Sequence, residues 1–136
     1  MIEPVNIQIR YSDIDLMGHV NNAVYLNYFE YTRVHYFDKL LGKEWDWEHE
    51  GFILVQNKVE YITPLLLKDK PIIEMSIGAI GNKSFVLHYE IRLNEQICTR
   101  ASSKMVGYNM IEKKSIVIPE KMKKSFSLLM KHQQKP

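Results

Sequence analysis

The first residues of the chain alternate between apolar and polar side chains. Between positions 4 and 10 every second residue is Val or Ile, the period-two pattern of a half-buried strand. A polar loop follows over residues 11–21, and apolar residues then return at near-helical spacing from Tyr25 to Leu41. Gly42 comes next and is a residue that commonly ends a helix. The predicted helix is rich in aromatic residues, which indicates burial on more than one side, as if a sheet wrapped around it.

The second half of the chain reads as strands. Four runs rich in β-branched and aromatic residues cover about residues 52–61, 71–80, 84–93 and 96–108. Compact turns at 81–83 and 94–95 separate the last three runs and predict an antiparallel meander. A further extended stretch over 115–118 precedes Pro119, which suits the first turn of a final helix running to about residue 131. This order predicts an α+β fold in which the long helix lies on one face of a curled sheet.

Length and composition indicate one water-soluble domain spanning residues 1–136. The hydrophobic and charged fractions, 46% and 25%, are ordinary for a globular protein, and no apolar run approaches the ~20 residues of a membrane helix. Residues 1–4 carry no export pattern, so we expect a cytoplasmic protein. The single cysteine, Cys98, excludes an internal disulfide and has no partners at metal-ligand spacing.

Positive charge is concentrated in the last quarter of the chain, although the net charge is only +2. One interpretation is a solvated face of the terminal helix with its tail, and the other is a local field that attracts a phosphate-bearing ligand. We expect no nucleic-acid partner, because basic and aromatic residues are not interleaved there and no binding motif is present. The lysines concerned are Lys113, Lys114, Lys121, Lys123, Lys124, Lys131 and Lys135.

The polar loop ahead of the long helix carries the candidate chemistry. It holds Asp13, Asp15, Gly18 and His19, followed by two asparagines at the expected helix start. Unpaired backbone N–H groups and the positive end of the helix dipole lie at such a start and attract developing negative charge. The two aspartates are two residues apart, so in an extended stretch their side chains project to opposite faces and only one of them faces a substrate. The other is expected to cap the helix or to pair with a neighbouring arginine.

Residues 11–25, Tyr-Ser-Asp-Ile-Asp-Leu-Met-Gly-His-Val-Asn-Asn-Ala-Val-Tyr, resemble the signature of hot-dog-fold acyl-CoA thioesterases of the 4-hydroxybenzoyl-CoA thioesterase type. Segments 57–64 and 80–85 resemble the second strand and a later turn of that family, and the resemblance extends over about residues 5–130. The His-Val-Asn-Asn segment is also similar to plant-type acyl-ACP thioesterases. The resemblance implies a long central helix wrapped by a five-stranded antiparallel sheet. It also implies a homo-oligomer, either a dimer that pairs its sheets edge to edge or a tetramer, with active sites at the subunit interface.

The resemblance further implies roles for individual residues. Asp15 matches the catalytic carboxylate, which acts as general base for water or attacks the thioester carbonyl directly. Backbone N–H groups near Asn21 and Asn22 are expected to stabilise the oxyanion, and the Asn22 side chain is also a candidate helix cap. His19 is expected to hydrogen-bond the carboxylate, orient water or line the pocket. The expected substrate-binding residues are Gly18, Tyr25, Tyr61, Thr63, Pro64, Lys83 and Ser84.

Within that set, Lys83 and Ser84 are expected to contact the phosphates of coenzyme A. Tyr61 and its neighbours Thr63 and Pro64 are expected to line the pocket from the neighbouring subunit. On the helix, Glu30 and Arg33 are spaced for a weak ion pair without a catalytic part.

Other chemistries fit the sequence less well. Three candidate ligands on one loop, Asp13, Asp15 and His19, are weak support for a metal, so we expect neither a metal nor a cofactor beyond the coenzyme A of the substrate. An aspartyl phosphatase needs an apolar strand end before its aspartate, and residues 10–12 are not one. The sequence therefore predicts a cytoplasmic acyl-CoA thioesterase. The alternatives are hydrolysis of acyl-ACP, whose acidic carrier suits the terminal lysines, and a non-catalytic acyl-CoA sensor; the acyl group itself is left open.

Overall fold

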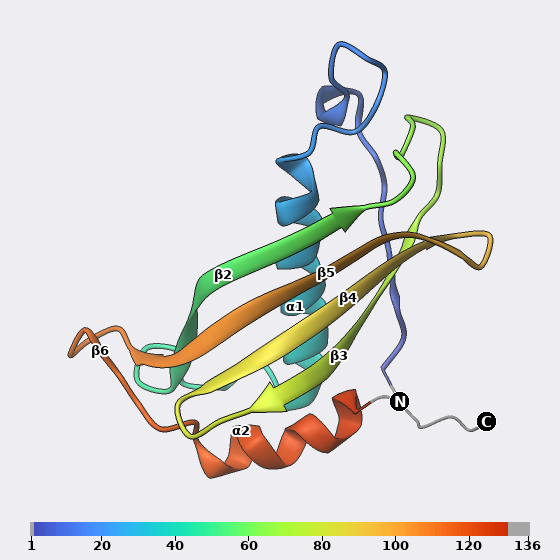
Figure 1. Ribbon diagram of the computed structural model, residues 1–136. Coiled ribbons are helices and arrows are strands. Elements are labelled where there is room, and N and C mark those ends of the chain that lie inside the picture. Colours follow the sequence, from blue (N-terminus) through green and yellow to red (C-terminus); the bar gives the residue numbers. More distant parts are fainter. Residues whose placement is uncertain (1, 131–136) are drawn as a thin grey trace.

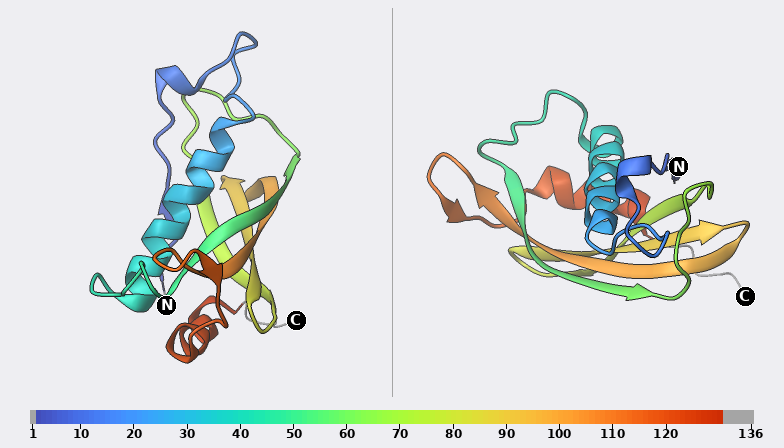
Figure 2. Two further views of the ribbon diagram at one scale, coloured as in Figure 1. Left: turned by 90° about the vertical axis from the view of Figure 1, so that its left-hand side faces the viewer. Right: turned by 90° about the horizontal axis from the view of Figure 1, so that it is seen from above.

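The computed structural model describes residues 2–130, which form a long helix lying in the hollow of a curled antiparallel sheet (Figure 1). The strands follow the order β1-β3-β4-β5-β2, and β6 pairs with β5. The predicted α+β arrangement and the meander of the last three long strands are therefore confirmed, and Figure 2 shows the sheet curving around the helix. The elements are α1 (Val24–Leu41), α2 (Glu120–Ser125), β1 (Val5–Asn6), β2 (Gly51–Tyr61), β3 (Ile72–Ile80), β4 (Ser84–Leu93), β5 (Gln96–Asn109) and β6 (Lys114–Ser115).

Aromatic side chains of α1 form the contact between helix and sheet. Phe29 stacks on Tyr89 of β4 with ring centroids 4.5 Å apart, and Phe37 meets Phe52 of β2 at 4.9 Å. The opposite side of the helix is uncovered, since Val34 is 61% exposed. The aromatic content thus reflects burial against the sheet, while residues 2–130 leave one face of the helix uncovered.

Two predicted elements differ in length from those observed. The strand expected over residues 4–10 is confined to Val5–Asn6, although the buried Ile7 and Ile9 continue its alternation. The Ile7 N–H still donates to the carbonyl of Pro71 at 3.1 Å, but proline has no N–H to return, so the ladder ends. The final helix divides into α2 and a short 3-10 turn, Phe126–Leu129, and its predicted end at residue 131 lies outside the described residues.

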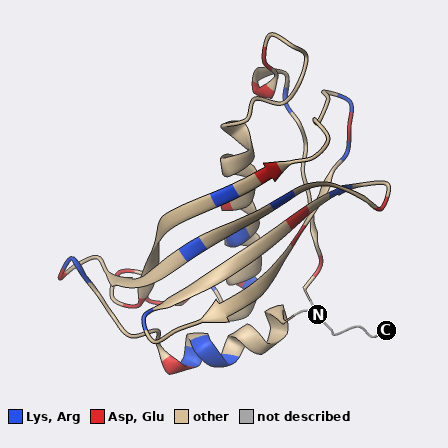
Figure 3. Cartoon of the chain, in the orientation of Figure 1, with Lys and Arg blue, Asp and Glu red and all other residues tan. Residues whose placement is uncertain are grey.

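The lysines of α2 lie at the end of the molecule away from the loop that precedes α1 (Figure 3). Met122 of this helix is buried against the core, whereas Lys121 and Lys124 are exposed. This arrangement is that of an amphipathic helix with a solvated basic face. None of the described helices is long and apolar enough to cross a membrane.

Candidate active site

The loop before α1 is a tight hairpin-like turn. Ile14 and Val20 form a β-bridge, the Asp15 N–H donates to the His19 carbonyl at 2.7 Å, and the Gly18 N–H donates back to the Asp15 carbonyl at 3.0 Å. Gly18 has a φ of +81°, a left-handed conformation that side-chain-bearing residues adopt only with strain. Gly18 is therefore required by the turn, and its proposed contact with substrate is a separate matter.

Asp15 is half-buried and oriented by its own loop. Its Oδ1 accepts the Met17 N–H at 2.9 Å and the His19 N–H at 3.2 Å. Its Oδ2 accepts no hydrogen bond from any residue within the described range 2–130. One oxygen thus fixes the carboxylate while the other is available to a water or a carbonyl carbon.

Asp13 has the structural role expected of the second aspartate. It is 3% exposed, and its Oδ2 accepts the Arg10 N–H at 2.9 Å and the Tyr28 hydroxyl at 2.7 Å. Burial by itself raises the pKa of Asp13, but these hydrogen bonds and the Arg10 charge outweigh it and hold the pKa below its usual value. Burial and the neighbouring carboxylate together raise the pKa of Tyr28 well above its usual range. This cluster anchors the loop to α1.

The start of α1 leaves one amide available. The Asn21 N–H donates to the Asp13 carbonyl at 2.8 Å, and the Ala23 N–H donates to the Asn21 Oδ1 at 2.8 Å. The Asn22 N–H has no acceptor among the residues the structure describes. Of the amides expected to stabilise an oxyanion, Asn22 therefore remains and Asn21 is occupied. The prediction of Asn22 as a side-chain cap is wrong, because the N-cap of α1 is Ala23 and no side-chain cap hydrogen bond is present there.

Tyr61 lies against the helix start within the same chain. Its hydroxyl donates to the Asn22 carbonyl at 2.9 Å, and its ring meets Tyr25 edge-on at 4.9 Å. Tyr25 is 2% exposed, and burial raises its pKa. The sequence led us to expect Tyr61 to reach the site from a neighbouring subunit, but the β2 end of the same chain carries it there.

The remaining expected site residues fall into two groups. Thr63 and Pro64 are exposed in the β2–β3 loop, which packs on the loop before α1 through a bridge between His19 and Leu66. The β3–β4 turn, which carries Lys83 and Ser84, lies at the opposite end of the sheet from the loop that precedes α1 (Figure 1). One chain therefore does not bring Lys83 to Asp15.

The sequence analysis missed a pocket between α1 and β2, which we call the α1–β2 pocket. Its cavity volume is about 520 Å³. The Glu30–Arg33 ion pair expected on this helix is absent from the ion pairs of the described residues, and the Arg33 Nη1 donates instead to the Tyr89 hydroxyl at 2.9 Å. Lining residues include Leu26, Arg33 and Phe37 from α1 and Phe52, Leu54 and Asn57 from β2.

The two acidic residues of the loop, Asp13 and Asp15, have separate partners, as described above. Within the described part of the chain, no group of three or more His, Cys, Asp or Glu side chains is arranged to hold a metal ion.

Known proteins are similar to this chain in sequence and in fold. Residues 9–126 match the family described as the Thioesterase-like superfamily, so the chain belongs to that family. It is 24% identical to the long-chain acyl-CoA thioesterase FadM of Escherichia coli over 128 residues, which are 92% of this chain and 97% of FadM. It is 28% identical to the uncharacterized protein YsmA of Bacillus subtilis over 83 residues, 61% of this chain and 56% of YsmA.

A solved structure with the same fold is a thioesterase from Thermus thermophilus complexed with coenzyme A and Zn. It has a TM-score of 0.82 and 26% identity, with 93% of this chain and 92% of that chain covered. The protein is thus a hot-dog-fold thioesterase with acyl-CoA thioesterases among its homologues.

Proposed function

We propose that this protein hydrolyses acyl-CoA thioesters and that Asp15 is its catalytic carboxylate. The observation that carries the proposal is the different hydrogen bonding of the two Asp15 oxygens. Oδ1 accepts hydrogen bonds from two loop amides, and Oδ2 accepts none from the described residues. The FadM likeness over nearly the whole chain supports an acyl-CoA substrate.

In the proposed reaction Asp15 accepts a proton from water as the oxygen attacks the thioester carbonyl carbon. The π electron pair of the C=O bond moves to the carbonyl oxygen, which becomes an oxyanion. The Asn22 N–H stabilises this oxyanion, a contact typically worth ~3 kcal/mol. When the intermediate collapses, the C–S bond breaks, and the thiolate of coenzyme A leaves and takes up a proton. Direct attack by Asp15 to form a mixed anhydride, hydrolysed by water in a second step, uses the same geometry.

His19 and Gly18 support this arrangement through the loop. The His19 N–H helps to orient Asp15, and the left-handed Gly18 allows the turn that brings these groups together. Tyr25, Tyr61, Thr63 and Pro64 belong to the proposed substrate-binding wall around the start of α1.

We also propose that the working unit is a homodimer joined through β2, with a tetramer as a further assembly of such dimers. β2 is the longer of the two strands at the ends of the sheet path, and its Ile53, Leu54 and Val55 are 42%, 41% and 51% exposed. An apolar edge strand of this kind is a template for pairing with another strand. Antiparallel pairing of two β2 strands brings the Lys83–Ser84 turn of one subunit toward the Asp15 end of the other, where it is available to coenzyme A phosphates.

Replacement of Asp15 tests the catalytic assignment. We expect Asp15→Asn to lower kcat by at least ~100-fold, because a positioned base contributes about that much, while thermal stability and affinity for acyl-CoA are kept. The measurement is release of free thiol from a panel of acyl-CoA and acyl-ACP thioesters. Glu112→Gln, which changes an exposed carboxylate paired with Lys114 in the β5–β6 turn, is the matched control and should retain full activity.

The panel also separates the alternatives. Turnover of acyl-ACP but not acyl-CoA would favour the carrier-protein substrate. Binding without turnover by both wild type and Asp15→Asn would indicate an acyl-CoA sensor and contradict the hydrolase proposal.

A further inference from the structure

A chain of four hydrogen-bonded side chains crosses the sheet from α1 to β2. Arg33 donates to the Tyr89 hydroxyl at 2.9 Å, Tyr89 donates to the Ser103 Oγ at 2.9 Å, and Ser103 donates to the Asn57 Oδ1 at 2.6 Å. Tyr89 and Ser103 are 1% and 0% exposed, whereas Arg33 and Asn57 at the two ends both line the α1–β2 pocket. The buried middle of the chain therefore fixes the positions of two polar groups in one pocket.

The direction of this chain decides which atoms face a ligand. A guanidinium can only donate hydrogen bonds, so the Tyr89 hydroxyl accepts one from Arg33. The Tyr89 hydroxyl then donates its single proton in the hydrogen bond to the Ser103 Oγ. Ser103 in turn donates to Asn57, whose contacting atom must be the amide oxygen. The Asn57 Nδ2 keeps both of its N–H donors, and no residue of the described range accepts from them.

The cation at the other end has no counter-ion. Within the described residues Arg33 makes no ion pair within 4.0 Å, and its one side-chain hydrogen bond goes to Tyr89. Glu30 and Asp38 also line the pocket, but both are exposed. The half-buried guanidinium lies beside apolar walls that include Phe52 and Leu54, so its remaining donors favour an acceptor once a ligand displaces water.

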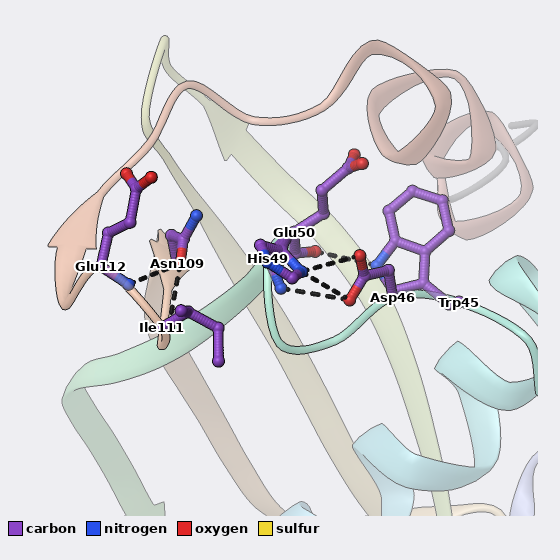
Figure 4. Close-up of polar contacts among 7 residues, drawn as sticks. All are labelled: Trp45, Asp46, His49, Glu50, Asn109, Ile111 and Glu112. Carbon is purple, nitrogen blue, oxygen red and sulfur yellow. Dashed lines mark hydrogen bonds and ion pairs between the residues drawn. The ribbon is translucent and has the colours of Figure 1, made fainter.

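The walls are held in place before any ligand binds. Phe29 stacks on Tyr89 at 4.5 Å, which fixes the middle of the hydrogen-bonded chain. The segment carrying Trp47, another lining residue, is braced by the Trp45 indole N–H, which donates to the Glu50 carbonyl at 2.8 Å, and by the contact between Asp46 and His49 (Figure 4). Preorganised donors lose little entropy on binding, so they can discriminate between ligands.

We propose that the α1–β2 pocket receives the acyl part of the thioester, and that Arg33 and Asn57 select acyl groups whose far end carries a carboxylate or another hydrogen-bond acceptor. This inference rests on the proposed thioesterase function. Arg33 lies roughly 14 Å along α1 from its first residue, Val24, at the usual helical rise. The selected group is thus remote from the thioester carbon, and its recognition acts on substrate choice rather than on bond breaking.

Matched substrates test the inference. Pairs of acyl-CoA thioesters of equal chain length, one ending in a methyl group and the other in a carboxylate, are compared at several lengths. We expect the wild type to favour the carboxylate-ended member by at least ~10-fold in kcat/KM at the best length, mainly through KM. The corresponding ω-hydroxy thioester, a neutral acceptor, should lie between the two.

Two variants probe the donors separately. Arg33→Met removes the cation, and Asn57→Asp keeps an oxygen for Ser103 while it replaces the free N–H donors by a negative charge. Both should abolish the preference for the carboxylate-ended member of each pair. Lys104→Met, which removes an exposed cation of β5 that does not line the pocket, is the matched control and should keep the preference. Thermal melts verify that each variant is folded.

Binding of the same pairs to Asp15→Asn, measured by calorimetry, tests selection independently of turnover. Equal affinities for the two members, or a preference that survives both pocket variants, would overturn the inference. Hydrolysis without preference therefore defeats the selection proposal alone, whereas preferential binding by a protein that hydrolyses none of the thioesters defeats the proposed catalysis alone.

Discussion

At the scale of single residues, two carboxylates of one loop have opposite environments. Asp13 is buried and accepts hydrogen bonds from Arg10 and Tyr28. Asp15 is half-buried, and among the described residues only its Oδ1 accepts hydrogen bonds. A carboxylate whose lone pairs are occupied by internal donors is a poor base, because its charged form is already stabilised. The pairing with Arg10 thus makes Asp13 an anchor, which supports our proposal of Asp15 as the catalytic carboxylate.

The anchor has a measurable contribution to stability. We expect Asp13→Asn to lower the free energy of unfolding by about 1–3 kcal/mol at neutral pH, because the charged hydrogen bonds in a buried site are weakened. The pKa of Asp13 is lower in the folded than in the unfolded state, so its contribution is complete above the unfolded value of about 3.9 and is lost as the pH falls through the folded value.

Urea unfolding of wild type and variant from neutral to acidic pH provides this measurement. The difference between the two proteins should be constant above about pH 5 and should shrink below about pH 4. A difference that grows on acidification would contradict the assignment. Tyr28→Phe removes one donor to the same carboxylate and should show a smaller effect with the same pH trend.

At the scale of elements, the two ends of α1 have different tasks. Its amino-terminal end carries the available Asn22 amide, whereas its carboxyl-terminal end is a structural stop at Gly42. Gly42 has φ +83° and ψ 168°, a region that residues with a Cβ rarely occupy. Its N–H donates to the Asp38 carbonyl at 3.0 Å, which closes the last turn before the tryptophan-bearing segment.

Replacement of that glycine isolates the structural end. Gly42→Ala should destabilise the protein by about 1–2 kcal/mol, because the backbone must either strain or shift. Chemical denaturation measures the loss, and kcat of the folded protein should be unchanged because Asp15 lies at the other end of the helix. Gly81→Ala, at a turn glycine without a left-handed φ, should cost less. Equal losses in the two variants would show that the backbone conformation of Gly42 is not the cause.

At the scale of the whole molecule, one chain leaves a face of α1 and an apolar edge of the sheet exposed. The sheet covers one side of α1, while Tyr31 and Val34 on the other side are 60% and 61% exposed, and β2 ends the sheet with an apolar edge. The β3–β4 turn, which carries Lys83, lies at the end of the sheet away from the loop that precedes α1 (Figure 1). A second copy paired through β2 covers the edge and supplies the distant turn, which is why we propose that dimerisation is required for activity.

Solution mass and dilution test this requirement. Light scattering should give a mass twice the 16.1 kDa of one chain, or four times that for a tetramer. Val55→Lys, which adds a charge on the β2 edge, should weaken association and lower activity per subunit on dilution. Val117→Lys is the matched control, because Val117 is also 51% exposed but lies outside the sheet edge. A fully active monomer would refute the shared site.

The sequence alone was enough to predict the order of elements, the long helix ending at Gly42 and the β3-β4-β5 meander, and to single out the loop before α1 as the candidate site. These features depend on local periodicity and turn chemistry, which neighbouring residues set. The early end of β1, opposite Pro71, depended on a hydrogen bond between two segments, which periodicity does not encode. The contact between the Asn21 side chain and the Ala23 N–H is local, but two adjacent asparagines do not show which of them makes it.

The pairing of the polar residues depended on how distant segments pack together. Arg33, Tyr89, Ser103 and Asn57 come from α1, β4, β5 and β2, and nothing in their sequence spacing links them. The fold joins them because the helix crosses the sheet where three strands are in register, and burial then obliges each polar group to find a partner. The fold also gives Asp13 hydrogen-bond partners and leaves the Asp15 Oδ2 without one among the described residues. Two aspartates in one short motif do not show this difference in the sequence.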